Sequence, residues 1–241
     1  MEIINEQDRD IVSRAAADIL KSLLLLYGSA WESDLKDVLM GIWSIRNLNL
    51  EQIGELQDAL SEAEKLLSEK KIIEIEKKLQ ETGAVLKLVE PENLHITIKF
   101  LGEISEKELP LIKKILEKNA ELFEPFEITL EKLGAFPSIS HPRVIWVGIS
   151  QNKDKVTSLA NKISADLERA GFRREERAFH PHITIARVKR QNSRLKKEIM
   201  QYQNSVFGRI KVNNIRLKKS TLTPQGPIYT TIFEIPIKKE E

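Results

Sequence analysis

The sequence contains no cysteine, and none of its apolar runs is long enough to cross a membrane. Without cysteine, neither disulfide bonds nor thiolate metal sites can form. An apolar run such as Leu23–Leu26 falls far short of the roughly 20 residues that a transmembrane helix needs. The first ten residues are polar and acidic, unlike a secretory signal peptide. We therefore expect a cytoplasmic protein that has no membrane partner.

Charged residues are abundant but unevenly distributed along the 241-residue chain. Residues 1–72 carry 8 basic and 14 acidic side chains, a net charge of −6, whereas residues 73–241 carry 30 basic and 22 acidic side chains, a net charge of +8. A basic region favours a polyanionic partner, and an acidic region does not. If the protein binds RNA or DNA, we expect binding through residues 73–241.

Residues 1–72 have the periodicity of helices. Apolar residues recur at helical spacing over residues 8–27, over residues 33–43 and from about residue 50 onward. The last apolar stripe loses its phase where Lys70 and Lys71 occupy the positions that should continue it. Because such a slip means that the two parts bury different faces, we predict an all-α N-terminal domain that ends at about residue 72.

The N-terminal region carries no catalytic signature. Three helices followed by Ile72–Ile75 would fit a winged-helix domain, but the net charge of −6 argues against nucleic-acid binding. Contact with a protein partner, homo-oligomer formation and completion of the second domain remain as alternative roles for residues 1–72.

Two short segments share an alternation of apolar and polar residues that is typical of β-strands. They are Leu94–Lys99 and Pro181–Ala186, and each contains a His-x-Thr sequence. Successive side chains of a strand point to opposite faces. Each segment is therefore expected to present an imidazole and a hydroxyl group on a single face, namely His95 with Thr97, and His182 with Thr184.

The two segments belong to a longer internal repeat. His95 and His182 are 87 residues apart, and the elements predicted around them overlap when shifted by that amount. We expect an α+β fold of two pseudo-symmetric lobes with antiparallel sheets around a central groove. The predicted elements are a helix to residue 82, strands at 85–89 and 94–99, a helix at 107–122, strands at 126–133 and 143–149, a helix at 153–170, a strand at 181–186, a helix at 192–203, and strands at 209–218 and 229–237.

The repeat also has a gap. The second lobe has a strand at 143–149 ahead of its helix, but the equivalent position in the first lobe, 56–62, has a helical pattern. Weak candidates for the absent strand are Met1–Ile4 and Gly41–Arg46.

The sequences around both His-x-Thr motifs match a known pattern. The matching stretches are Lys87–Thr97, Lys99–Glu103, Pro142–Gly148, Phe179–Val188 and Lys219–Tyr229. Through them, residues 73–241 resemble the 2H phosphoesterases, in particular the RNA 2′,3′-cyclic phosphodiesterases, also called 2′-5′ RNA ligases. Residues 1–72 lie outside the resemblance. The family usually begins with an apolar strand that is not recognisable here, in agreement with the gap in the repeat.

The resemblance implies a reaction for the paired histidines. Histidine suits acid–base catalysis near neutral pH, and two histidines on opposite sides of a phosphorus atom allow in-line displacement without a metal. By resemblance, His95 is the acid toward the 3′ oxygen of an RNA 2′,3′-cyclic phosphate and His182 is the base, which leaves a 2′-phosphate. The threonine hydroxyl groups would donate hydrogen bonds to the non-bridging oxygens. The reverse activity would be 2′-5′ RNA ligation.

Four further residues are candidates for substrate binding. Lys99 shares the strand face of the first histidine and could pair with a phosphate, although a solvated lysine is equally consistent. Arg187 follows the second threonine by three residues and could contact phosphate or support the motif. Phe179 and Tyr229 could stack on a base, although core packing is the commoner role of such aromatics.

No cofactor and no metal are expected. His180 and His182 are spaced like a pair of metal ligands, but no third histidine accompanies them nearby in the sequence.

Two functions from different classes fit these observations. The first is a metal-independent phosphodiesterase acting on RNA ends with 2′,3′-cyclic phosphates, of which tRNA fragments are one source. The alternative is an RNA-end-binding module without turnover, regulated or oligomerised through the N-terminal helices. The presence of both histidines and both threonines favours the enzyme.

Overall fold

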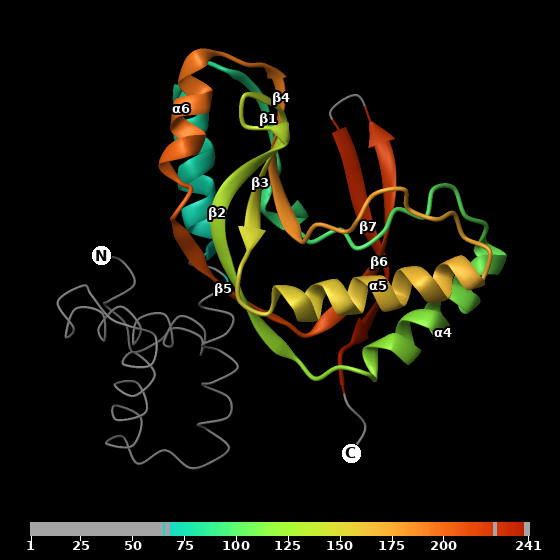
Figure 1. The fold of residues 1–241 in the computed structure, drawn as a ribbon. Helices are drawn as coiled ribbons and strands as arrows, with labels where there is room; N and C mark the ends of the chain where they lie inside the picture. The colour runs from blue at the N-terminus through green and yellow to red at the C-terminus, as the bar shows by residue number, and fades with distance from the viewer. Residues whose placement is uncertain (1–64, 66–67, 224–225, 239–241) are drawn as a thin grey trace, which may run out of the picture. The chain divides into compact units, whose positions relative to one another are not determined.

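The computed structural model describes residues 65, 68–223 and 226–238 (Figure 1). The chain divides into two compact units, Met1–Ser68 and Glu69–Glu241. The predicted N-terminal helices and both candidates for the absent strand lie outside the described residues. The second unit is an α+β fold with antiparallel sheets, which confirms the fold class expected for it. No helix among the described residues has the length and hydropathy of a membrane span.

Five strands form one antiparallel sheet in the order β1-β4-β3-β2-β5 (Figure 1). β-branched and aromatic residues are abundant in these strands because their side chains pack well on a pleated surface. The predicted strands at 126–133 and 143–149 are longer than expected and extend into the intervening turn. The five strands are β1 (Val85–Leu88), β2 (Phe126–Ser138), β3 (His141–Ile149), β4 (His182–Arg190) and β5 (Val206–Val212).

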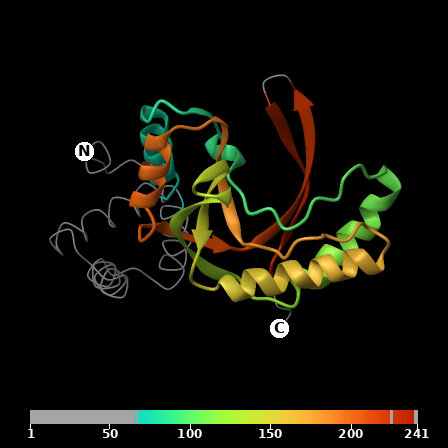
Figure 2. The same ribbon diagram turned by 45° about the horizontal axis from the view of Figure 1, so that its top comes forward.

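Two helices lie side by side against this sheet (Figures 1 and 2). One comprises residues 69–81 and stops before Gly83, whose φ of +79° is the left-handed conformation that glycine adopts at helix ends. The other is α6 (Ser193–Gln201), which Asn192 caps by accepting a hydrogen bond from the Leu195 N–H at 2.9 Å. Asn192 also donates to the Thr82 carbonyl at 3.0 Å, so one residue ties the two helix ends together.

A continuous hydrophobic core fills the space between these helices and the sheet. The helices supply Ile72, Leu79 and Ile199, all fully buried. The sheet supplies buried residues from every central strand, including Ile128, Leu130, Leu133, Ile145, Val147, Ile183 and Ile185.

The remaining strands, β6 (Asn214–Thr223) and β7 (Gly226–Pro236), form a separate two-stranded antiparallel sheet. It packs against α4 (Leu109–Ala120) and α5 (Lys153–Arg169), which cross beneath it in Figure 2. This second lobe has its own core, formed by Ile112, Leu116, Leu159, Ile163, Leu167, Ile215, Ile235 and Ile237.

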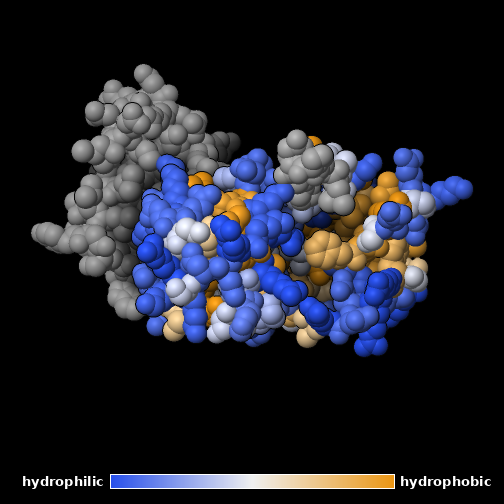
Figure 3. Space-filling model, turned by 90° about the horizontal axis from the view of Figure 1, so that it is seen from above, coloured by the Kyte–Doolittle hydropathy of each residue, from blue (hydrophilic) through white to orange (hydrophobic). Residues whose placement is uncertain are grey.

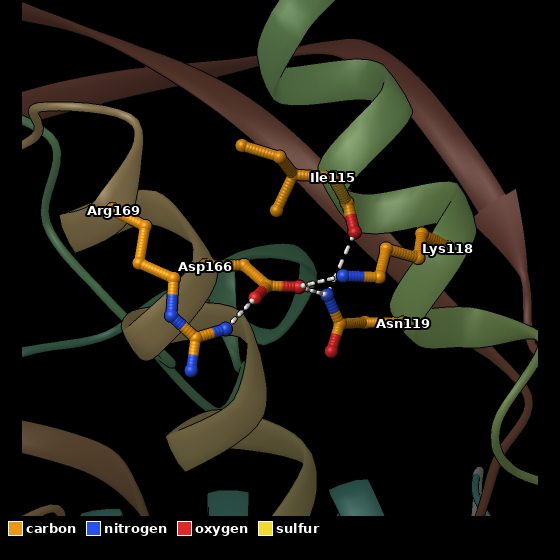
Figure 4. Close-up of polar contacts among 5 residues, drawn as sticks. All are labelled: Ile115, Lys118, Asn119, Asp166 and Arg169. Atoms are coloured by element: carbon orange, nitrogen blue, oxygen red, sulfur yellow. Dashed lines mark hydrogen bonds and ion pairs between the residues drawn. The ribbon is translucent and has the colours of Figure 1, made fainter.

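A polar cluster joins the two helices of the second lobe (Figure 4). Asp166 of α5 accepts hydrogen bonds from Lys118 at 2.9 Å and from Asn119 at 3.1 Å, both on α4, and pairs with Arg169 at 2.7 Å. Hydrogen bonds from Lys118 and Asn119 lower the pKa of Asp166. The Asn119 amide also donates to the Ile115 carbonyl at 2.9 Å.

The predicted repeat is present in the arrangement of the elements. Shifted by 87 residues, β2 falls on 213–225 and overlaps β6, while β3 falls on 228–236 and lies within β7. The two lobes are therefore related as the repeat predicts, but each contains elements from both halves of the chain. The strand at 143–149, expected in the second lobe, is β3 of the five-stranded sheet, whereas α4 packs with α5.

Two predicted strands are wrong in detail. Residues 94–99 do not form a regular strand, because their only recorded bridge within the described residues joins Ile96 to Ile183. The predicted strand at 209–218 is two strands, β5 and β6, which belong to different sheets. The alternation continues through Asn213, the residue at which the chain leaves one sheet for the other.

Candidate active site

A single antiparallel bridge brings the two His-x-Thr motifs together. It pairs Ile96 with Ile183, which are equivalent residues of the 87-residue repeat. Ile183 is buried in the core of the five-stranded sheet. Since neighbours along a strand point to opposite faces, His182 and Thr184 of β4 point away from this core.

The register of this bridge indicates how the motifs face each other. In a regular antiparallel ladder, continuing it by one residue in each direction would set His95 opposite Thr184, and Thr97 opposite His182. The two histidines would then be diagonal neighbours, and such positions lie roughly 7–8 Å apart. A phosphate group held between two imidazoles would fill that span.

The two imidazoles are oriented in the same way by the backbone. The Nδ1 atom of His95 lies 2.6 Å from the Asn93 carbonyl oxygen, and the Nδ1 atom of His182 lies 2.5 Å from the His180 carbonyl oxygen. A carbonyl oxygen can only accept a hydrogen bond, so Nδ1 carries the proton in each ring. The Nε2 atom of each histidine is thereby left to act as a base when neutral or as an acid when protonated.

The surroundings of His182 are aromatic. Its ring centroid lies 5.1 Å from that of Phe136, 6.1 Å from that of Trp146 and 5.9 Å from that of His180. Trp146 can approach this closely because it lies over Gly134, where a Cβ atom would come within 2.1 Å of the indole. Burial lowers the pKa of His180, and the charge of His182 lowers it further.

The surroundings of His95 are different. Its ring meets the edge of Tyr229 with centroids 5.4 Å apart, and the ammonium of Lys218 lies 5.8 Å from the centre of the Tyr229 ring. Burial lowers the pKa of His95, the hydrogen bond to Asn93 opposes this, and the positive charge of Lys218 lowers it further. The neutral imidazole is therefore favoured at His95.

The remaining predicted site residues are placed unequally. Tyr229 contacts a catalytic candidate, as described above, whereas Phe179 packs against the core of the five-stranded sheet. Lys99 points toward α5, where its 2% exposed side chain lies 3.9 Å from Glu168, and this contact favours a structural role. Arg187 is exposed on β4, opposite Val144 of β3 and Lys87 of β1.

Three residues near the histidines were not predicted from the sequence. Trp146 and Phe136 form the aromatic surroundings of His182, and Trp146 belongs to a stretch that matches the family pattern. Lys218 lies beside Tyr229. The available signal was its position two residues before Ser220, which belongs to a stretch that matches the family pattern.

Seen from above, hydrophobic patches interrupt a mostly hydrophilic surface (Figure 3). The large exposed apolar residues include Phe100, just after the first motif, at 72% exposure, and Ile228, beside Tyr229 in sequence, at 59%. Apolar and aromatic surfaces of this kind can stack on nucleobases.

A sequence comparison identifies the family to which this constellation belongs. The family described as LigT-like phosphoesterase matches residues 51–146 and 147–229. The chain belongs to this phosphoesterase family. The match begins at residue 51, so the expectation that all of residues 1–72 lie outside the resemblance is corrected for residues 51–72.

Relatives of this LigT-like phosphoesterase carry one functional name. The chain is 43% identical over 144 residues to the RNA 2′,3′-cyclic phosphodiesterase of Archaeoglobus fulgidus, a match that covers 60% of this chain and 80% of the relative. It is 39% identical over 157 residues to the protein of the same name from Aeropyrum pernix, covering 64% of this chain and 88% of the relative.

Solved structures share the fold. A protein of Thermus thermophilus matches with a TM-score of 0.61 and 29% identity, covering 72% of this chain and 93% of that chain. Escherichia coli LigT, solved with 3′-AMP, matches with a TM-score of 0.56 and 24% identity, covering 71% of this chain and 92% of that chain. These matches confirm the two-lobe architecture.

Proposed function

We propose that this phosphoesterase hydrolyses the 2′,3′-cyclic phosphate ends of RNA to 2′-phosphates without a metal ion. The observation that carries the proposal is the Ile96–Ile183 bridge, because it joins the two His-x-Thr motifs at their central residues. The name shared by the archaeal relatives supports the same substrate class.

The reaction divides between the two imidazoles. The Nε2 atom of one histidine takes a proton from water as the water oxygen attacks phosphorus. The P–O3′ bond breaks on the opposite side, and the Nε2 atom of the other histidine gives its proton to the departing 3′ oxygen. A 3′-hydroxyl and a 2′-phosphate result, and the two rings have exchanged protonation states.

The threonines stabilise charge during this displacement. The hydroxyl groups of Thr97 and Thr184 donate hydrogen bonds to the non-bridging oxygens, whose negative charge is redistributed as the bonds change. Ile96 and Ile183, which the bridge joins, directly precede these two threonines. One phosphate can therefore contact both motifs at once.

We assign the acid role to His95 and the base role to His182, as the family resemblance implies. An acid must be protonated, whereas burial and Lys218 lower the pKa of His95 in the free protein. A bound phosphate brings a negative charge to this side of the site, and that charge raises the pKa of a neighbouring imidazole.

The same groups serve 2′-5′ RNA ligation. When a 5′-hydroxyl of a second RNA replaces water as the nucleophile, the product is a 2′-5′ phosphodiester bond. RNA ends such as those of tRNA fragments are the proposed substrates, in the cytoplasm. Residues 1–72 are proposed to bind a protein partner or a second copy of the chain.

The decisive experiment is hydrolysis of a nucleoside 2′,3′-cyclic phosphate in the presence of EDTA. The wild-type protein should turn over and release a 2′-phosphate, identifiable by ³¹P NMR. His95→Ala and His182→Ala should each lower kcat by about 10³-fold, within the range for a lost general acid or base. His141→Ala is the matched control, since His141 is exposed and lies at the start of β3.

Two results would contradict the proposal. Full activity in either active-site variant would remove the paired-histidine mechanism. RNA binding without turnover by the wild-type protein would favour the alternative of an RNA-end-binding module.

A further inference from the structure

A β-bulge in the second lobe decides which lysine shares a face with Tyr229. The register between β6 and β7 shifts between Leu217, which pairs with Phe233, and Lys218, which pairs with Thr231. Ile232 is thus the extra residue, and it lies on β7, so the alternation of faces changes on β7 while β6 alternates regularly. Without that extra residue, Lys219 rather than Lys218 would pair with Thr231.

Lys218 now shares a face with Tyr229. Thr231 and Tyr229 are two residues apart on β7 and lie on the same side of the strand. The Lys218 side chain is half-buried, whereas Lys219 is exposed. The Nζ atom of Lys218 lies 5.8 Å from the centre of the Tyr229 ring. The centroid of that ring is 5.4 Å from the centroid of the His95 ring. The bulge thus sets Tyr229 beside Lys218, on the side of the site that holds His95.

The charge of Lys218 is not compensated by the described part of the chain. No ion pair recorded within residues 68–223 and 226–238 includes Lys218, and its charged neighbour is Arg216, which repels it. Arg216 itself pairs with Glu234 at 2.7 Å. A partly desolvated ammonium without an acidic partner is costly, and an anion that binds there relieves the cost.

We propose that Lys218 binds a phosphate oxygen of the substrate on the His95 side of the site, with the Tyr229 ring beside its ammonium. This inference rests on the proposed function, because it assigns the residue to the same cyclic phosphate substrate. The influence of Lys218 on the charge of His95 supports it, since both residues then face the same phosphate.

An RNA end offers Lys218 two phosphates to bind. One is the reacting cyclic phosphate, and the other is the phosphodiester on its 5′ side. Both offer an anionic oxygen to an ammonium group. A nucleoside 2′,3′-cyclic phosphate contains only the first, whereas an oligonucleotide with the same end contains both.

The test compares Lys218→Met with Lys219→Met on both substrates. The two variants lose the same charge from adjacent positions of β6, but only the first loses the half-buried lysine. Lys218→Met should raise KM by about tenfold or more, in line with one charge-assisted contact. Lys219→Met should behave as wild type, and Lys218→Arg should recover most of the lost affinity.

Each outcome has a distinct meaning. A raised KM on both substrates assigns Lys218 to the reacting phosphate, and a raised KM on the oligonucleotide alone assigns it to the neighbouring one. Wild-type values for Lys218→Met on both substrates, or an equal loss in Lys219→Met, would overturn the inference while leaving the proposed function intact. An inactive wild-type protein would overturn the proposed function and the inference with it.

A second readout follows the histidine itself. In the free protein, NMR titration should give a higher pKa for His95 in Lys218→Met than in the wild type, because the nearby positive charge is gone. Arg216 and Lys219 remain on β6 in that variant, so the difference reports Lys218 alone.

Discussion

The two His-x-Thr segments have nearly the same sequence pattern but different backbone support. The second lies at the start of β4, which pairs with β1 on one side and β3 on the other. The first is held by the one bridge at Ile96, and its residues are only partly buried. The two motifs can therefore lie side by side without equal participation in a sheet.

The neighbours of the two histidines differ as well. His182 lies among aromatic rings, whereas His95 lies beside a phenol and a lysine. Two equivalent positions of a repeat thus have different electrostatic surroundings. An acid–base pair needs this difference, because one member must hold a proton while the other lacks it.

The largest effect expected from this comparison concerns the threonines. Thr97→Val and Thr184→Val remove one hydroxyl from each motif and keep the shape of the side chain. If both donate to the phosphate in the transition state, each substitution should lower kcat by about 10²-fold with a small change in KM. Steady-state kinetics on a nucleoside 2′,3′-cyclic phosphate measure this.

Thr230→Val provides a control at an exposed threonine of β7. A loss confined to Thr184→Val would mean that only the segment within the sheet orients its hydroxyl correctly.

The next effect concerns a buried acid in the five-stranded lobe. Burial raises the pKa of Glu76 to about 7, the Val89 backbone opposes this rise, and the charge of Glu90 reinforces it. Between about pH 4.5 and pH 7 the unfolded chain ionises Glu76 while the folded protein keeps it protonated. The unfolded state then binds fewer protons, so stability falls as the pH rises through this window.

Glu76→Gln should remove that pH dependence. At pH 8 the variant should be more stable than the wild type by about 2 kcal/mol, because the ionised carboxylate is absent. Urea denaturation at pH 5 and pH 8 measures the difference. Glu74→Gln, an exposed position of the same helix, should change little at either pH. Equal pH dependence in wild type and Glu76→Gln would contradict the prediction.

A smaller effect should separate the two bridging isoleucines. Ile183 is 4% exposed and part of the core, whereas Ile96 packs against that core only partly buried. Ile183→Val should lower the free energy of unfolding by about 1 kcal/mol, and Ile96→Val should lower it by less. Equal losses, measured by urea denaturation, would mean that the first motif is packed as firmly as the second.

The smallest effect is expected in the second lobe. Hydrogen bonds from Lys118 and Asn119 lower the pKa of Asp166, so its contribution to stability is present above the pKa of the unfolded aspartate and is lost as the pH falls. Asp166→Asn should lower Tm slightly at pH 7 and lower it by less as the pH falls below the ordinary pKa of aspartate. This acid therefore has the opposite pH dependence to Glu76, and a constant Tm difference would argue against it.

Much of the fold could be predicted from side-chain periodicity. The alternation in β4 and the helical spacing of α5, with Val156, Leu159, Ile163 and Leu167 buried, record which face meets the core. Periodicity does not record whether a backbone has hydrogen-bonding partners. For that reason residues 94–99 have the pattern of a strand without being one.

The candidate site could be predicted in part for a related reason. The histidines and threonines recur in a repeat, which makes them visible in the sequence. Lys218 could not be found in the same way, because an extra residue on the other strand, Ile232 of β7, decides that Lys218 shares a face with Tyr229. Trp146 reaches His182 only because Gly134, on the neighbouring strand, leaves room for its ring. The pattern within a single strand does not show such a contact.

The hydrogen bonds that aim the two rings use only main-chain oxygens, at positions 93 and 180. Every amino acid supplies such an oxygen. The orientation of the imidazoles therefore does not depend on which amino acids occupy positions 93 and 180. Substitutions at these two positions should leave the orientation of both Nε2 atoms unchanged.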